Sequence, residues 1–117
     1  MDRQSASEHY GNCHCGCVQL VLRDTPSEVV ECNCSICRRI AGRWHYCAPD
    51  AVTVVGGGVA YRQGDGALDL WHCATCGCTT HWTPTDPAYA RMGINLRMFD
   101  PALWRELPLR LVDGANY

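Results

Sequence analysis

Three clusters of cysteine are the part of this sequence whose residue types and spacing best fit chemistry. They are Cys13-His-Cys15-Gly16, Cys32-Asn-Cys34-Ser-Ile-Cys37 and Cys73-Ala-Thr-Cys76-Gly77-Cys78, in a chain with 10 cysteines among 117 residues. Thiols grouped in short loops are typical of zinc sites. The clusters do not divide evenly into two sites of four cysteines, which suggests one closed structural zinc and one zinc with an open position.

The first and third clusters have the form of two zinc-binding loops. A glycine follows the second cysteine of each, where it can adopt positive φ and let backbone N–H groups approach the sulfurs. Four thiolates give a closed tetrahedral site. We therefore predict a structural zinc that ties the N-terminal strand to residues 68–71 and is held by Cys13, Cys15, Cys73 and Cys76. The alternative is that these cysteines are buried and bind no metal.

The second cluster places three thiols within one short loop. Cys32, Cys34 and Cys37 can face one ion and leave its fourth corner for water or substrate, which is the catalytic arrangement of zinc. Arg38 and Arg39 follow directly, and can offset the negative charge of a three-thiolate zinc or bind carboxylates of a substrate. A closed second site remains open as an alternative, with its fourth ligand drawn from Cys17, Cys47, Cys78, His14, His45, His72 and His81.

Composition excludes several classes of partner. The net charge of −2 and the pI of about 6.2 give no basic field for nucleic acid or an anionic membrane. All basic residues are Arg, which excludes Schiff-base lysine chemistry. No apolar run reaches the length of a membrane span, and residues 1–10 are polar, unlike a secretory leader. We expect a cytoplasmic protein, in which thiols stay reduced; a secreted disulfide-rich domain is the alternative.

The length predicts one domain, residues 1–117, with many short strands and Gly/Pro turns. We expect a mainly β, antiparallel fold with a short helical turn at residues 37–40, capped by Ser35 and ended by Gly42. A second turn begins at Pro101. Gly56-Gly57-Gly58 predicts a hairpin or a corner. The expected strands are residues 18–22, 29–32, 45–48, 52–55, 59–62, 68–72, 79–82 and 91–98.

These motifs resemble the glutathione-dependent formaldehyde-activating enzyme family, which includes centromere protein V. The resemblance covers about residues 11–100 and leaves residues 101–117 as a C-terminal extension. The motifs that support it are Gly11-x-Cys13-His14-Cys15-Gly16-x-Val18, Cys32-x-Cys34-Ser35-x-Cys37-Arg38-Arg39-x-x-Gly42 and Cys73-x-x-Cys76-Gly77. It implies a β-tent fold of small stacked antiparallel sheets held by two zinc ions, with the same division of cysteines. The chain departs from the family at Asn33, where histidine is common, and at Cys78, where a small hydroxyl residue is usual.

The resemblance implies a carbon–sulfur lyase that joins a thiol such as glutathione to a small aldehyde such as formaldehyde, or reverses that reaction. Zinc then delivers the thiolate or polarises the aldehyde. We expect carboxylates to be held by Arg38 and Arg39, with Arg62 as a third candidate, and the pocket to be walled by Trp44, Tyr46, Trp71 and Trp82. Two other functions stay open. One is a non-enzymatic zinc module, with residues 102–112 as a protein-binding or homodimer contact; the other is a thiol or metal sensor using Cys17, Cys47 and Cys78.

Overall fold

The computed structural model describes residues 8–62 and 64–116, with nothing said of the Asn116 side chain. Residues 1–7, on which part of the expectation about a leader rests, lie outside the described residues. The strands are β1 His9–Asn12, β2 Gln19–Leu22, β3 Val29–Cys32, β4 Trp44–Cys47, β5 Val52–Val55, β6 Gly58–Arg62, β7 Leu68–Cys73, β8 Thr79–Pro84, β9 Met92–Asn95 and β10 Leu109–Val112. The helical segments are α2 Cys37–Ile40, η1 Pro49–Ala51, η2 Leu96–Met98, α3 Pro101–Trp104 and η3 Gly114–Asn116.

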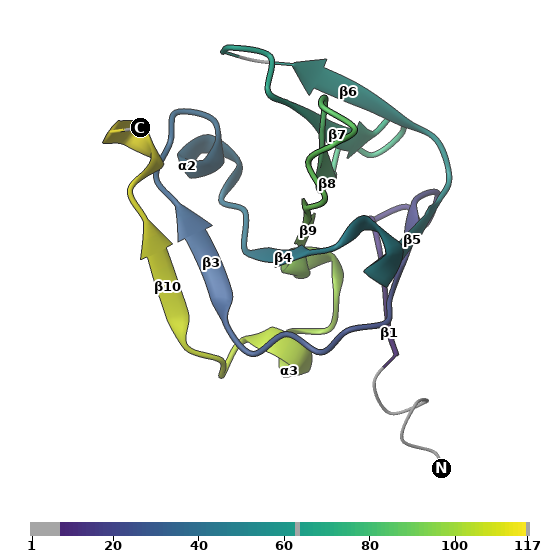
Figure 1. Cartoon of the computed structure of the whole chain (residues 1–117). Helices are drawn as coiled ribbons and strands as arrows, with labels where there is room; N and C mark the ends of the chain where they lie inside the picture. Colours follow the sequence, from purple (N-terminus) through teal and green to yellow (C-terminus); the bar gives the residue numbers. More distant parts are fainter. Residues whose placement is uncertain (1–7, 63, 117) are drawn as a thin grey trace.

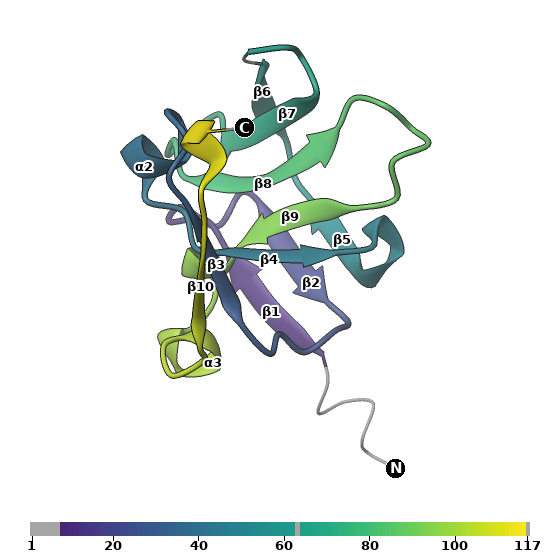
Figure 2. The ribbon, with the colours of Figure 1, turned by 60° about the vertical axis from the view of Figure 1, so that its left-hand side comes forward.

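The strands form two sheets, and the prediction of a mainly β fold is confirmed. A three-stranded sheet has the order β1-β2-β5, and a seven-stranded sheet has the order β10-β3-β4-β9-β8-β7-β6 (Figures 1 and 2). Every pairing is antiparallel except that of β10 with β3, which is parallel. Among the described residues, no helix has the length and apolar character needed to cross a membrane.

The main core fills the space between the two sheets. Alternate strand residues point into it, since successive side chains of a strand face opposite sides. Its buried members are Leu20, Leu22, Val29, Cys47, Val52, Met92, Ile94, Leu96 and Phe99. The opposite face of the large sheet carries a second apolar cluster around Val30, Trp44 and Leu70, with Cys37 and Tyr46 packed against it. The large sheet is therefore covered on both faces near its middle, and the second face holds the loop of the second cysteine cluster.

Several local predictions are refined by the structure. The three glycines form a corner and not a hairpin, because β5 belongs to the small sheet and β6 to the large one. A Cβ on Gly56, whose φ is +112°, would collide with the Cys17 carbonyl, so the corner requires glycine. The helical turn α2 ends at Ala41 in the left-handed region and not at Gly42, and no side chain caps its start. Asp100 does cap α3, accepting a hydrogen bond from the Ala102 N–H.

The C-terminal residues join the large sheet as an edge strand. β10 lies alongside β3, and η3 lies beside α2 at the end of both strands (Figure 1). Leu111 is 72% exposed and Leu109 is 48% exposed on the outer side of this edge. The expected homodimer contact stays a prediction.

Candidate metal centres

The first and third cysteine clusters of the sequence meet in space and form one group of the four cysteines predicted to bind the structural zinc. This group is called the first cluster from here on, and Cys32, Cys34 and Cys37 remain the second cluster. The sulfurs of Cys13, Cys15, Cys73 and Cys76 all lie within 4.8 Å of one another. The Cys13–Cys15 and Cys15–Cys73 sulfur pairs are 3.7 Å and 3.6 Å apart. Four sulfurs about 2.3 Å from one tetrahedral ion are separated by about 3.8 Å, so this set fits zinc closely. Their roles as ligands remain a prediction.

Backbone N–H groups prepare the same sulfurs for a cation. The Val18 N–H donates to Cys13 Sγ at 3.3 Å, and the Thr75 N–H donates to Cys73 Sγ at 3.3 Å. N–H groups of Cys78 and Cys15 lower the pKa of the Cys76 thiol to about 5. Gly77 follows in the left-handed region with φ of +82°. At Cys73 and Cys76 the loops thus favour the thiolate, the form of cysteine that binds metal. At Cys15 the Cys17 backbone acts in the same direction, but burial and the thiols of Cys17, Cys73 and Cys13 raise the pKa to about 12.

The second cluster brings three sulfurs together, with no fourth ligand beside them in the part of the chain that the structure describes. Cys32, Cys34 and Cys37 place their sulfurs within 4.8 Å of one another. No other Cys, His, Asp or Glu in residues 8–62 and 64–116 has a ligand atom within that distance of all three. The donor set and its spacing fit a soft cation such as zinc, with one coordination position left to a ligand from outside the set.

The three thiols need a cation to ionise together. Burial opposes ionisation of Cys34, yet N–H groups of Cys37 and Ile36 lower its pKa; the Cys37 N–H lies 3.4 Å from Cys34 Sγ. Burial and the neighbouring Cys34 and Cys32 raise the pKa of Cys37. An ion at the centre reverses these repulsions, because each thiolate then faces a positive charge.

The residues suggested as a fourth ligand lie elsewhere. Cys47 is buried in the main core, and Cys78 packs with the first cluster. His45 Nε2 lies 3.1 Å from Asp24 Oδ2. His81 Nδ1 lies 2.8 Å from Thr80 Oγ1, and burial lowers its pKa to about 4, so it stays neutral.

His72 lines an apolar cleft of about 520 Å³ between α2 and the β6–β7 hairpin. The other lining residues are Ile36, Ile40, Tyr61, Leu70, Gly77 and Thr79. Ile36 directly precedes Cys37, so the cleft adjoins the loop that carries the three cysteines, although none of the three lines it.

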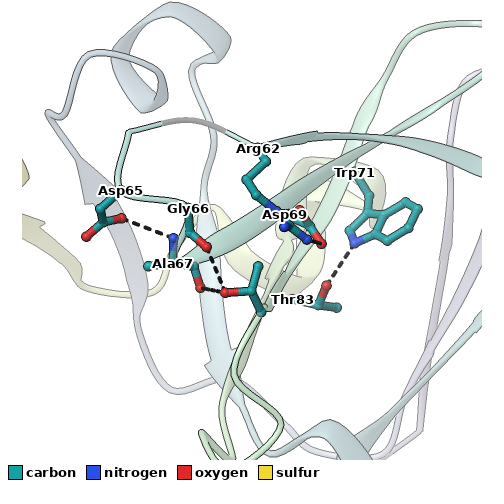
Figure 3. Close-up of polar contacts among 8 residues, drawn as sticks. Arg62, Asp65, Gly66, Ala67, Asp69, Trp71 and Thr83 are labelled. Carbon is teal, nitrogen blue, oxygen red and sulfur yellow. Dashed lines mark hydrogen bonds and ion pairs between the residues drawn. The ribbon is translucent and has the colours of Figure 1, made fainter.

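The arginines predicted for the substrate differ in their surroundings. Arg38 and Arg39 are exposed on α2, and Arg39 Nη1 donates to the Ser35 carbonyl at 2.6 Å. Arg62 forms a two-pronged contact with Asp69 on the neighbouring strand, at 2.8 Å and 3.0 Å (Figure 3). Its guanidinium is thereby committed to the β6–β7 hairpin.

The four aromatic residues predicted to wall the substrate pocket lie in different surroundings. Trp44 is 1% exposed and belongs to the core. Trp71 faces away from the cleft and donates through Nε1 to Thr83 Oγ1 at 2.9 Å (Figure 3). Tyr46 and Trp82 meet edge to face, with ring centroids 5.9 Å apart, on the side of the large sheet that carries the second cluster. These two rings form a wall near the three sulfurs.

The structure adds a contact that the sequence did not reveal. The C-terminal turn η3 lies against the second cluster so closely that a Cβ on Gly114 would come 2.5 Å from Cys32 Sγ. Asn33 holds this turn: its Nδ2 donates to Asp113 Oδ1 at 3.0 Å, and its Oδ1 accepts from the Ala115 N–H at 2.9 Å. The Asp113-Gly114 pair signals a turn, but only the pairing of β10 with β3 brings it here.

Comparisons with known proteins agree with this architecture. The family model described as glutathione-dependent formaldehyde-activating enzyme matches residues 8–107. A crystal structure of a Rhodobacter sphaeroides protein superposes with a TM-score of 0.70 at 28% sequence identity, covering 86% of this chain and 99% of that chain. The family match spans both cysteine clusters and most of the chain. The protein therefore belongs to the glutathione-dependent formaldehyde-activating enzyme family.

Proposed function

We propose that this protein is a zinc-dependent enzyme that adds a glutathione-like thiol to a small aldehyde such as formaldehyde, or reverses that addition. The observation that carries the proposal is the group of three sulfurs, Cys32, Cys34 and Cys37, with no fourth ligand among the described residues and a cleft beside it. The cysteines of the first cluster would hold a second, structural zinc. Family membership supports the thiol and the aldehyde as substrate classes.

The reaction forms one carbon–sulfur bond: the thiol sulfur attacks the carbonyl carbon, and the proton of the thiol ends on the carbonyl oxygen. A zinc at the second cluster supplies positive charge that favours the thiolate, which is the reactive form. Cys32, Cys34 and Cys37 hold that ion. Ile36 and Ile40 give one side of the nearby cleft an apolar surface.

Tyr46 supports the carbonyl side of this chemistry. Burial, together with Cys32 and Cys37, raises the pKa of its hydroxyl to about 12, while Arg110 and Arg91 act in the opposite direction. The hydroxyl therefore stays protonated at neutral pH and can donate a hydrogen bond to an oxygen on which negative charge develops. Arg38 and Arg39 remain candidates for substrate carboxylates.

The first test is metal analysis with X-ray absorption on the reduced protein, with and without glutathione. We expect two zinc ions per chain, one with four sulfur ligands and one with three sulfurs and a light atom that glutathione replaces with sulfur. Two zinc sites with four protein ligands each, whose coordination does not change on adding glutathione, would contradict the prediction of a zinc with an open position. They would favour the structural zinc module, because a closed site offers no position for a substrate.

A second arm measures the exchange of formaldehyde with glutathione by NMR. Wild-type protein should accelerate the exchange, and Cys34→Ser should abolish the acceleration while retaining the zinc of the first cluster. An acceleration that survives Cys34→Ser would separate the reaction from the second cluster.

A further inference from the structure

A second, polar cavity lies on the same face of the large sheet as the second cysteine cluster. It has a volume of about 150 Å³ and is lined by Ser27, Glu28, Val30, His45, Tyr46, Arg91 and Arg110. Pairing across the sheet places Arg110 opposite Val30 and Val112 opposite Cys32. The two pairs are two residues apart along β10 and β3, so all four side chains point to the same face of the sheet. The cavity and the sulfur of Cys32 therefore share a face of the same two strands.

Most charges in this cavity are already paired. Arg110 Nε contacts Glu28 Oε2 at 2.9 Å, and His45 contacts Asp24 at 3.1 Å. Arg91 differs, because its guanidinium carbon lies 4.9 Å from the centroid of the Tyr46 ring and no carboxylate among the described residues pairs with it. A guanidinium that contacts an aromatic ring and has no carboxylate partner keeps N–H groups available to bind an anion.

Tyr46 connects this arginine with the face that carries the second cluster. Its ring contacts Arg91, and it packs against the same apolar cluster as Cys37. Its ring also packs on Trp82, which limits its rotation. A molecule whose sulfur reaches the second cluster can therefore extend along Tyr46 toward the free edge of Arg91.

We propose that Arg91, held over the Tyr46 ring, binds a carboxylate of the thiol substrate and so makes the enzyme selective for anionic thiols. A planar guanidinium edge matches a carboxylate with two parallel hydrogen bonds. A small aldehyde such as formaldehyde has no carboxylate, so this site serves the thiol. The inference rests on the proposed function, because it assumes that a thiol approaches Cys32, Cys34 and Cys37.

The test is calorimetric titration of the zinc-loaded protein with glutathione and with glutathione diethyl ester, which keeps the thiol and masks both carboxylates. Wild-type protein should bind glutathione roughly tenfold more tightly than the ester, as one charge-assisted contact predicts. In Arg91→Gln this preference should fall close to one, through weaker binding of glutathione, while the affinity for the ester is unchanged. Zinc content should remain at the wild-type value.

Arg105→Gln is the matched control, since Arg105 is also an exposed arginine but lies at the end of α3 and does not line the cavity. It removes the same charge and should keep the tenfold preference. A preference that persists in Arg91→Gln, or that is lost equally in Arg105→Gln, overturns the subsite. So does loss of the preference in Arg38→Gln alone. If wild-type protein binds neither compound, the proposed function fails together with the subsite, whereas equal binding of both compounds overturns the subsite alone.

Discussion

At the scale of single residues, the second cluster depends on a glycine that lies far from it in the sequence. Gly114 fits against Cys32 Sγ only because it has no side chain. Asn33 fixes the turn through its hydrogen bonds to Asp113 and to the Ala115 backbone. This is the position at which the resemblance leads one to expect histidine, so the asparagine has a structural role in this chain as a clamp for the C-terminal turn.

Gly114→Ala should therefore weaken metal binding at the second cluster. The added methyl group must displace either the turn or the Cys32 sulfur, and changes next to metal ligands cost about 10- to 100-fold in affinity. Competition with a chromophoric chelator measures this loss. Gly57→Ala is the control, because a Cβ there meets no atom within 4 Å. Wild-type zinc affinity in Gly114→Ala would mean that the turn moves away without effect on the site.

At the scale of elements, the first cluster joins the two sheets. Cys13 follows β1 and Cys73 ends β7, so one ion would connect the β1–β2 hairpin to the β7–β8 hairpin. The apolar packing around this junction is small, with Cys13, Val18 and Cys73 as its buried members. Binding of a structural zinc contributes about 10–16 kcal/mol, which is as large as the whole stability of a typical domain, about 5–15 kcal/mol.

Cys73→Ser should accordingly prevent folding, giving insoluble protein or a chain without a cooperative thermal transition. Circular dichroism and zinc analysis of the soluble fraction measure this outcome. Cys17→Ser is the matched control, since Cys17 is exposed and outside the four-sulfur group. A soluble Cys73→Ser protein that melts like the wild type and keeps one zinc would refute the structural role of the first cluster.

At the scale of the whole molecule, the two clusters differ in how deeply the fold encloses them. Cys13 is 0% exposed and Cys73 is 1% exposed at the junction of the sheets, while Cys15 is exposed and Cys76 is half-buried. The three cysteines of the second cluster are all half-buried. A chelator can take the open position of a second ion without unfolding the chain, whereas a first ion would have all four positions filled, two of them by buried cysteines.

Removal of zinc should proceed in two phases. A moderate chelator should take the first equivalent with little change in far-UV circular dichroism, and the second equivalent should leave only as the β signal is lost. Stopped-flow absorbance of the chelator complex, recorded beside circular dichroism, follows both events. Release of both ions at one rate, together with unfolding, would contradict the difference in enclosure.

The division of the cysteines could be predicted because it depends on local spacing. Cys32, Cys34 and Cys37 lie in one loop. The glycines after Cys15 and Cys76 mark two further loops, and predicting the four-cysteine site required only that these two loops meet. The substrate side of the site could not be predicted in the same way. Arg91 directly precedes β9 and Arg110 lies in β10, and no local pattern distinguishes them from the arginines beside Cys37, which are exposed on α2.

The same limit applies to the sheet order. Alternation of apolar residues predicts most strands. It does not show that β5 and β6 belong to different sheets, because the three glycines between them are compatible with a hairpin as well as with a corner. From the sequence, residues 102–112 suggested a contact surface, with a strand or tail packed on the core as the alternative; the structure places Leu109–Val112 in the edge strand β10. Its parallel partner β3 is distant in the sequence, and register between distant strands is decided by packing across the whole sheet.

The pairing of β10 with β3 also has a consequence for the order of events during synthesis. Asn33 and Asp113, which close the wall of the second cluster, are 80 residues apart in the chain. Since chains are made from the N-terminus at about 5–20 residues per second, the three cysteines leave the ribosome several seconds before the turn that covers them. Thiols of the nascent chain are therefore open to zinc, and to oxidants, during an interval that the finished protein no longer has.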